Sequence, residues 1–202
     1  MRLVAATRNE HKLRELADIL AGVELAPLPE GVELPPEDGE TFAENALIKA
    51  RAAHAAATGD PALADDSGIE ARALGGRPGV RSARYAGEGA SDEENLEKLL
   101  REVADAGEDR RVAYVCAIAY LDADGREQIF FGRCEGELAS EPRGSGGFGY
   151  DPAFIPDDTG PEDRRTMGEL PAEAKHAISH RGRAARAMAR ALGLAAPQEA
   201  TR

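Results

Sequence analysis

The chain has 202 residues, of which 42% are hydrophobic and 31% are charged, and its formal net charge is −12. The length suits one sizeable domain, and the negative charge argues against a broad nucleic-acid-binding surface. Neither a secretory signal nor an apolar run of membrane length is evident, so we expect a cytoplasmic protein without a membrane partner. The two cysteines, Cys116 and Cys134, lack metal-ligand spacing and lie in strand-like segments, which predicts buried free thiols.

The N-terminal half alternates between predicted strands and helices. Asn9 can cap a first helix, and Thr41 with Glu44 forms the capping box of a second helix. The elements expected here are, in chain order, a strand at 2–6, a helix from Asn9 to Gly22, a loop at 26–40, a helix from Thr41 to about Ala57 and a short strand at 61–64.

The C-terminal half adds a hairpin to this alternation. Ser91 with Glu94 forms another capping box, and Asp124-Gly125 is a hairpin signal. The elements expected here are a helix from Ser91, a strand at 112–121, a returning strand at 128–134, and helices at 171–178 and 181–192. Because crossover units and a hairpin both occur, we expect an α/β fold with a mixed sheet.

The segment at 64–87 is polar and glycine-rich, and it begins with Asp65 and Asp66. Such a pattern is typical of a loop that leaves the end of a buried strand and holds charged groups in a cleft. Paired carboxylates there would hold a divalent metal and activate a water molecule. Taken alone, Asp-Asp-Ser-Gly is also ordinary turn chemistry.

The glycine-rich segment at 144–149 matches G-x-G-x-x-G, the dinucleotide-binding fingerprint. We reject that interpretation, because Pro142 precedes the segment and Tyr150-Asp151-Pro152 follows it, where the fingerprint needs a helix. The segment instead predicts a loop that brings Phe148 against a flat nucleobase.

Cations accompany two further segments, TRNEHK at 7–12 and KHAISHR at 175–181. Arg8 and Lys12 flank the N-terminus of the first helix, where positive side chains are disfavoured unless an anion binds. Arg181 presents a planar fork of donors that suits a purine edge or a phosphate. Read singly, Arg8 and Lys12 are also ordinary surface cations, and a lone histidine such as His180 is more often structural than functional.

Together, TRNEHK, ADDSG, GGFGYDP and AISHR resemble the non-canonical purine nucleoside triphosphate pyrophosphatase family, the inosine triphosphate pyrophosphatases. The resemblance runs from about Arg2 to Leu192. It implies an elongated mixed β-sheet flanked by helices, with two lobes and a central nucleotide-binding cleft. We expect residues 1–194 to form this single two-lobed domain and residues 195–202 to form a frayed tail. Glu173-Ala174 and His176 depart from the family pattern outside the core motifs.

The resemblance also implies the reaction and its residues. Inosine, deoxyinosine and xanthosine triphosphates (ITP, dITP and XTP) would be hydrolysed with Mg²⁺ to the monophosphate and pyrophosphate by a homodimer. Asp66 would be the catalytic group and a metal ligand, with Glu37 as the second ligand, and Asp65 a further ligand or an orienting neighbour. The implied substrate-binding residues are Thr7, Arg8, Asn9, Glu10, His11, Lys12, Ser67, Phe148, Gly149, Tyr150, Asp151, Lys175, His180 and Arg181.

Some alternatives stay open at this point. Asn45 and Lys49 share a helix face, and Lys49 would either reach a phosphate or lie in solvent. A Maf-like pyrophosphatase of other specificity and a non-catalytic nucleotide-binding protein are the rival functions. A dinucleotide-dependent oxidoreductase is disfavoured by the proline after the glycine loop.

Overall fold

The computed structural model describes residues 1–20, 22–57 and 59–194, so the predicted tail at 195–202 lies outside the described residues. Within them, six strands form one sheet in the order β2-β1-β3-β4-β5-β6. The strands are β1 (Arg2–Ala5), β2 (Glu24–Pro27), β3 (Ala62–Ala71), β4 (Arg111–Leu121), β5 (Glu127–Leu138) and β6 (Phe154–Pro156). Strand β1 pairs in parallel with β2 and β3, whereas β5 and β6 are antiparallel. The predicted mixed sheet is therefore confirmed.

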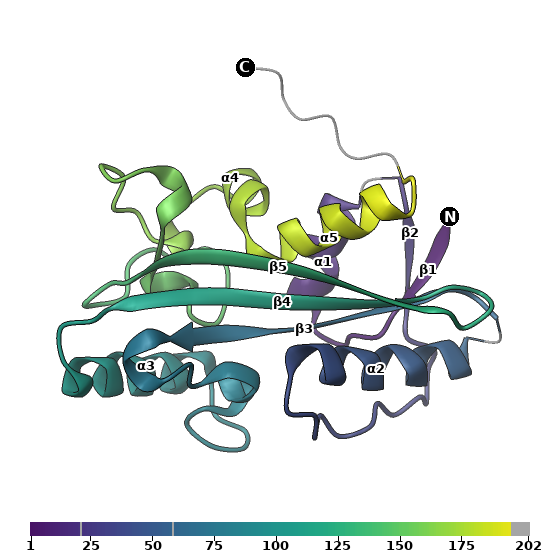
Figure 1. Ribbon diagram of the computed structural model, residues 1–202, viewed down its shortest axis with the longest axis horizontal. Helices are drawn as coiled ribbons and strands as arrows, with labels where there is room; N and C mark the ends of the chain where they lie inside the picture. Colours follow the sequence, from purple (N-terminus) through teal and green to yellow (C-terminus); the bar gives the residue numbers. More distant parts are fainter. Residues whose placement is uncertain (21, 58, 195–202) are drawn as a thin grey trace. The chain divides into compact units, whose positions relative to one another are not determined.

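Helices flank this sheet, as expected from the sequence (Figure 1). The α-helices are α1 (Glu10–Ile19), α2 (Phe42–Ala56), α3 (Asp92–Ala106), α4 (Ala172–Ile178) and α5 (His180–Ala191). Short 3₁₀ helices lie between them: η1 (Arg72–Leu74), η2 (Gly79–Arg84), η3 (Asp151–Ala153), η4 (Asp157–Thr159) and η5 (Met167–Glu169). The capping predictions are confirmed, since Asn9 caps α1 and the boxes of Thr41 and Ser91 begin α2 and α3.

The chain divides into two compact units. The first unit comprises Met1–Asp66, Cys116–Gly132 and the chain from Arg181, and the second unit comprises Ser67–Val115 and Arg133–His180. Strands β3, β4 and β5 each contribute residues to both units. Each unit has its own hydrophobic core cluster.

In the first unit, helices cover both faces of the sheet. Leu16 of α1 and Met188 of α5 join one core cluster with Leu63 of β3. Figure 1 shows α2 on the opposite side of the sheet, where it packs against β1. The side of α2 that is buried carries alanines at helical spacing, which lets the helix approach closely: Ala46, Ala50 and Ala53.

In the second unit, α3 supplies the longest helical contribution to the core. Leu96, Leu99 and Val103 recur at helical spacing and pack with Ile69 of β3 and Phe154 of β6. Helix α3 also packs against η1 and η2. Both cysteines are buried and free, as predicted from the sequence.

Three strand predictions need correction. The short strand expected at 61–64 continues to Ala71 as β3, so the acidic segment is strand and not a loop. Strand β2 takes the first residues of the predicted loop at 26–40, and β6 was not expected. The hairpin is confirmed, because β4 and β5 are neighbours and the Asp122 N–H donates to the Arg126 carbonyl (3.1 Å).

Candidate functional site

The two acids of ADDSG lie in strand β3, where successive side chains point to opposite faces. Asp65 contacts Lys12 of α1 and Arg181 of α5. Asp66 instead contacts residues of α2, on the other face. The carboxylates therefore have separate sets of partners, and the joint pair expected from their adjacency does not form.

On the α2 face, Asp66 is held by two donors from one helix. The Asn45 amide donates to Oδ2 (3.2 Å) and the Lys49 ammonium donates to Oδ1 (3.3 Å). Lys49 also donates to Glu37 Oε1 (2.6 Å), so a single ammonium joins both predicted metal ligands. The backbone N–H of Gly39 donates to the Asn45 side-chain oxygen (2.8 Å) and thereby fastens this loop to α2.

Gly39 is required by this close approach. A Cβ atom at this position would lie 2.7 Å from Asn45 Oδ1 and 2.8 Å from Glu44 Cβ. Any side chain here would push the loop away from α2. The loop that carries Glu37 is therefore shaped to bring its carboxylate to Lys49.

Burial and charge act together on the α2-face groups. Burial raises the pKa of Asp66, and Glu37 and Asp65 raise it further, against the opposing effect of Lys49. Burial lowers the pKa of Lys49, but Asp66, Asp65 and Glu37 outweigh it and raise the pKa overall. Lys49 therefore stays a cation beside a carboxylate that is a stronger base than usual.

On the opposite face, Asp65 forms a buried ion-pair network. Arg181 donates through Nε and Nη2 to Asp65 Oδ2 (3.0 Å each), and Lys12 Nζ lies 3.2 Å from the same oxygen. Arg181 also donates to Glu15, which is buried in α1. Burial alone would raise the pKa of Asp65, but Lys12 and Arg181 hold it well below its usual range.

This network leaves one polar atom unused. Asp65 Oδ1 is buried and has no hydrogen-bond partner within the described residues. Arg181 is itself buried, with its side chain 2% exposed. In this structure, its guanidinium serves the internal network, and its predicted contact with substrate stays a prediction.

The other residues of TRNEHK shape the start of α1. The Asn9 side chain accepts the N–H groups of His11 (3.0 Å) and Lys12 (3.1 Å). The Asn9 N–H in turn donates to Thr7 Oγ1 (3.1 Å), and Arg8 donates to the Val32 carbonyl (2.5 Å). Glu10 is the first residue of the helix. The segment is thus a capped helix start that brings Lys12 to Asp65.

In the second unit, Asp151 is the centre of a cluster that contains several predicted residues. Its Oδ1 accepts the Tyr114 hydroxyl (3.1 Å), and its Oδ2 accepts the Phe148 N–H (2.9 Å) and the Lys175 ammonium (2.7 Å). Lys175 Nζ lies 5.0 Å from the centroid of the Phe148 ring. The imidazole of His180 stacks on Tyr114, with centroids 4.5 Å apart.

The remaining predicted residues of this unit are also placed. Gly149 N–H donates to Asp92 (2.8 Å), and the Tyr150 hydroxyl donates to the Ser82 carbonyl (2.7 Å). Burial raises the pKa of Tyr150, so this hydroxyl stays protonated. Ser67 is a half-buried residue of β3.

Several residues of these clusters were absent from the predicted site: Glu15, Asn45, Lys49, Asp92 and Tyr114. The spacing of Asn45 and Lys49 on one helix face was a usable signal, because both reach Asp66. Glu15, Asp92 and Tyr114 gave no local signal, since each acts on residues far away in the sequence.

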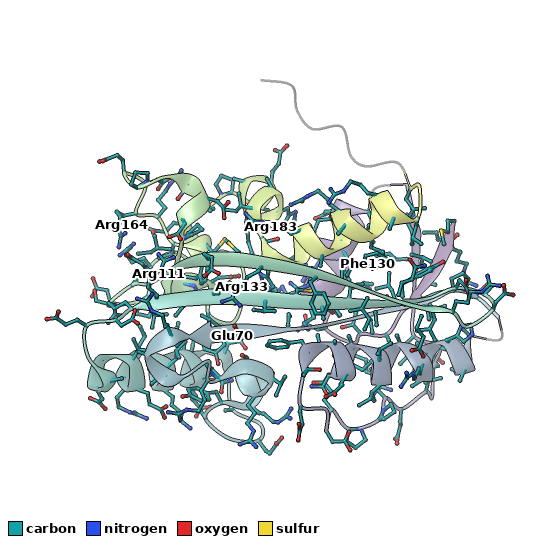
Figure 2. All side chains as sticks on the ribbon, in the orientation of Figure 1. Glu70, Arg111, Phe130, Arg133, Arg164 and Arg183 are labelled. Atoms are coloured by element: carbon teal, nitrogen blue, oxygen red, sulfur yellow. The ribbon has the colours of Figure 1, made fainter. Side chains whose placement is uncertain are left out.

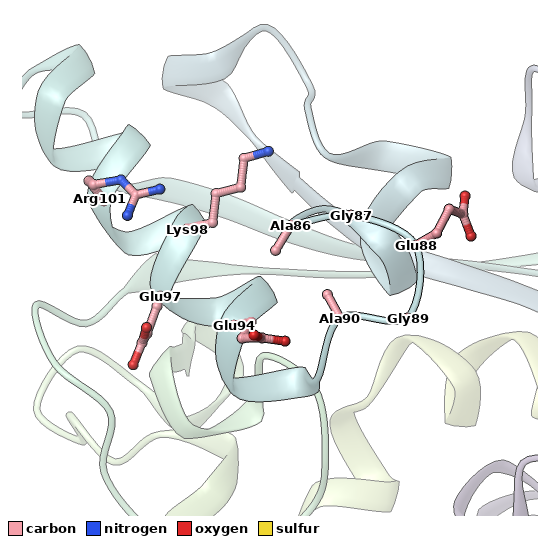
Figure 3. Close-up of a pocket in the computed structure, with 9 residues that line it drawn as sticks. All are labelled: Ala86, Gly87, Glu88, Gly89, Ala90, Glu94, Glu97, Lys98 and Arg101. Atoms are coloured by element: carbon pink, nitrogen blue, oxygen red, sulfur yellow. The ribbon is translucent and has the colours of Figure 1, made fainter.

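Two pockets in the second unit lie away from all predicted residues. The loop at 86–90 and the side of α3 line an open pocket of ≈ 550 Å³ (Figure 3). A smaller pocket of ≈ 290 Å³ is lined by Glu70, Arg111 and Arg133, among others. Figure 2 labels these three side chains, which come from β3, β4 and β5. The two arginines are already ion-paired, Arg133 with Glu70 and Arg111 with Asp157 (2.6 Å each).

A metal site can be judged from the donors that are present. Mg²⁺ takes oxygen ligands, commonly one or two carboxylates together with substrate phosphates and water. Glu37 and Asp66 both direct an oxygen at one cation, the Lys49 ammonium. Within the described residues, no group of three or more His, Cys, Asp or Glu side chains is arranged to hold a metal. Two carboxylates without a third protein ligand can hold Mg²⁺ only when substrate phosphates and water complete its coordination.

Comparisons with known proteins identify the family to which these motifs and this fold belong. A model of the Ham1 family matches residues 3–191. The dITP/XTP pyrophosphatase of Geobacter sulfurreducens is 52% identical over 189 residues, covering 91% of this chain and 92% of the relative. The dITP/XTP pyrophosphatase of Symbiobacterium thermophilum is 50% identical over 186 residues, covering 91% of this chain and 90% of the relative.

Solved structures show the same fold. A HAM1 protein from Coxiella burnetii has a TM-score of 0.85 at 42% identity, covering 96% of this chain and 100% of that chain. The Ham1 protein of Staphylococcus aureus has a TM-score of 0.83 at 38% identity, covering 96% of this chain and 98% of that chain. The resemblance carried by TRNEHK, ADDSG, GGFGYDP and AISHR is thus confirmed, and the chain belongs to the Ham1 family.

Proposed function

We propose that this protein hydrolyses non-canonical purine nucleoside triphosphates (dITP, XTP and ITP) to the monophosphate and pyrophosphate, and so removes them from the nucleotide pool. The names of relatives at about half identity support the substrate class. One structural observation carries the proposal. Asp66 is held in a fixed position by Asn45 and Lys49, and it shares the Lys49 ammonium with a second carboxylate, Glu37. Binding of a nucleotide alone does not require paired carboxylates at this position.

The proposal includes Mg²⁺, which Glu37 and Asp66 would hold. When bound, Mg²⁺ supplies charge neutralisation of the triphosphate and polarisation of a phosphate oxygen. The carboxylates that converge on Lys49 support a cation at this position.

The chain's own groups then have separate tasks. Asp66 accepts a proton from the attacking water at a carboxylate oxygen, and its raised pKa makes it a better base than an exposed aspartate. Lys49 keeps Asp66 oriented and supplies positive charge beside the reacting phosphate. Lys12, held by Asp65, stabilises the negative charge of the leaving pyrophosphate.

The base end of the substrate is assigned to the second unit. Phe148 stacks on the purine, which is favourable for any base. Discrimination then needs hydrogen bonds, and Lys175 and His180 are the predicted groups that can donate to a 6-oxo purine. Adenine presents an amino group at that position, so a buried donor would be left unpaired.

The test is release of pyrophosphate from XTP, dITP, ITP, GTP and ATP, with and without Mg²⁺. Wild type is compared with Asp66→Asn and with Asp105→Asn, which changes an exposed acid near the end of α3. We expect metal-dependent release from XTP, dITP and ITP that Asp66→Asn abolishes and Asp105→Asn preserves. Release from none of the triphosphates would leave a nucleotide-binding protein, and preference for other nucleotides would indicate a Maf-like specificity.

The assembly and location are part of the same proposal. We propose a homodimer that acts in the cytoplasm, on the basis of the family resemblance. No helix among the described residues is long and apolar enough to cross a membrane. Sedimentation equilibrium of the purified chain tests the dimer, because a monomer mass at all concentrations would contradict it.

A further inference from the structure

Phe148 lies between two glycines that both adopt left-handed backbone conformations. Gly147 has φ +75° and Gly149 has φ +62°. A glycine on each side leaves the backbone of Phe148 with unusual conformational freedom. The backbone position of Phe148, and with it the placement of its ring, must therefore be fixed by hydrogen bonds from side chains.

Two carboxylates provide these contacts by accepting consecutive backbone N–H groups. The Phe148 N–H donates to Asp151 Oδ2 (2.9 Å), and the Gly149 N–H donates to Asp92 Oδ2 (2.8 Å). Asp151 belongs to the same loop, whereas Asp92 is the first residue of α3, 57 positions away from Gly149. Hydrogen bonds to an ionised carboxylate are short and strong compared with those between neutral groups.

The two anchors differ in how firmly they are held. Asp151 is buried and is itself fixed by Lys175 and Tyr114. Asp92 is exposed, but it begins a helix whose N-terminus is fixed by the capping box of Ser91 and Glu94. On the side of Gly149, the Asp92 side chain fastens the glycine loop to α3, and the next residue, Tyr150, is hydrogen-bonded to Ser82 of η2.

We infer that Asp92 is a positioning residue for substrate binding: through the Gly149 N–H it holds the Phe148 ring in the orientation that receives the purine. The inference rests on the proposed function, in which Phe148 stacks on the base. Asp92 does not contact the groups assigned to the phosphates. Its loss should therefore raise KM and leave kcat nearly unchanged.

A purely structural role for Asp92 has to be separated from this one. An acid in the first turn of a helix also stabilises that helix through the helix dipole. Glu93 supplies a matched control, because it is an exposed acid in the same turn whose side chain makes no hydrogen bond or ion pair within the described residues. Glu93→Ala removes a similar dipole interaction and leaves the loop contact intact.

The first experiment measures kcat and KM for XTP and dITP, with the Tm of each protein, for wild type, Asp92→Ala, Asp92→Asn and Glu93→Ala. We expect Asp92→Ala to raise KM by about threefold to tenfold, the effect of one lost hydrogen bond. Asp92→Asn should restore most of the loss, since its amide oxygen accepts the same N–H. Glu93→Ala should keep the wild-type KM. This should hold even if Glu93→Ala and Asp92→Ala lower the Tm by the same amount. Equal KM values for Asp92→Ala and Glu93→Ala would overturn the inference.

A double-mutant cycle with Phe148→Leu tests the route of the effect. If Asp92 acts through Phe148, Asp92→Ala should add nothing to the KM of Phe148→Leu. Independent, additive effects would contradict the inference. A wild-type KM for Phe148→Leu would instead remove the role of Phe148 in the proposed function. A raised KM for Phe148→Leu with no effect of Asp92→Ala would refute the inference and leave the proposed function standing.

Discussion

At the scale of single residues, Lys49 shows how burial changes the role that a lysine side chain can have. A lysine on a helix is usually solvated, and the sequence leaves its role open on that ground. Its side chain is only 7% exposed, and its ammonium contacts both Glu37 and Asp66. Lys49 is therefore a buried cation with two carboxylate partners and not a solvated surface lysine.

Replacement of Lys49 by methionine should therefore remove activity without removing the fold. Methionine keeps most of the apolar stem but leaves Asp66 and Glu37 without their shared charge. We expect kcat/KM for XTP to fall by about two orders of magnitude, as for other lost electrostatic groups in active sites. Steady-state kinetics measures this, with circular dichroism to confirm folding.

Arg51→Met is the matched control for this change. Arg51 is an exposed cation on the same helix and pairs with Glu127 (2.6 Å). Its replacement should leave kcat/KM within about twofold of wild type, since exposed ion pairs contribute little. A wild-type rate for Lys49→Met, or an equal loss for Arg51→Met, would show that the assignment is wrong.

The sequence was enough to single out Asp65 and Asp66 as candidate site residues, but not to predict that they face opposite sides of β3. Asp65 and Asp66 stand out in the sequence as neighbouring carboxylates. Their separation onto two faces depends on β3 continuing through them, and on Arg181, which lies 116 positions from Asp65. A polar segment survives inside a strand because distant helices supply its partners, and no local pattern reveals such pairing.

At the scale of elements, the joint between α3 and η2 depends on an unusual tyrosine. The Tyr85 hydroxyl donates to Glu102 of α3, and Lys98 of α3 donates to the Tyr85 carbonyl (2.7 Å). The same ammonium lies 4.5 Å from the centroid of the Tyr85 ring. Burial and Glu102 raise the pKa of Tyr85 to about 12.

This tyrosine predicts how stability changes at alkaline pH. A pKa raised on folding means that the protonated phenol stabilises the native state below the unfolded value of 10.0, and this contribution is lost as the pH rises toward 12. The difference in free energy of unfolding between wild type and Tyr85→Phe should be constant below that window and shrink within it. Urea titrations at a series of pH values measure it, and a difference that stays constant throughout would contradict the prediction.

Long elements were predicted from the sequence, and short ones were not. The capped helices α1, α2 and α3 carry their own start signals and apolar spacing. Strands β2 and β6 are only 4 and 3 residues long, and each contains a proline. Both exist because a neighbouring strand pairs with them, which is a tertiary effect that overrides local propensity.

At the scale of the whole molecule, charge is the dominant feature. A net charge of −12 on 202 residues makes the folded chain repel itself, and the proposed substrate is also an anion. Against this background, the buried cations Lys49 and Arg181 and the half-buried Lys12 each lie beside a carboxylate.

Salt should therefore stabilise the protein in a pH-dependent way. At pH 7, where the net charge is −12, added NaCl should raise the Tm because it screens the self-repulsion. Near the sequence pI of ≈ 4.9 the repulsion disappears, and the same addition should leave the Tm unchanged or lower it. Differential scanning calorimetry at both pH values measures this. An equal rise in Tm at both pH values would contradict the prediction, because it would show that the salt acts by general exclusion from the protein surface and not by charge screening.

The register of β3 against β1 decides which of the two acids faces Asn45 and Lys49. Val4 pairs with Ala62 and Ala5 pairs with Leu63, and the two acids follow after Ala64. A slip of one position would exchange the faces, so that Asp65 met Asn45 and Lys49 while Asp66 met Arg181. After such a slip both acids would still be present. Asp66, the proposed proton acceptor, would however be paired with the buried Arg181. A deletion or insertion of one residue at 61–64 would therefore exchange the partners of the two acids, and we expect it to abolish the proposed activity although both acids are still present.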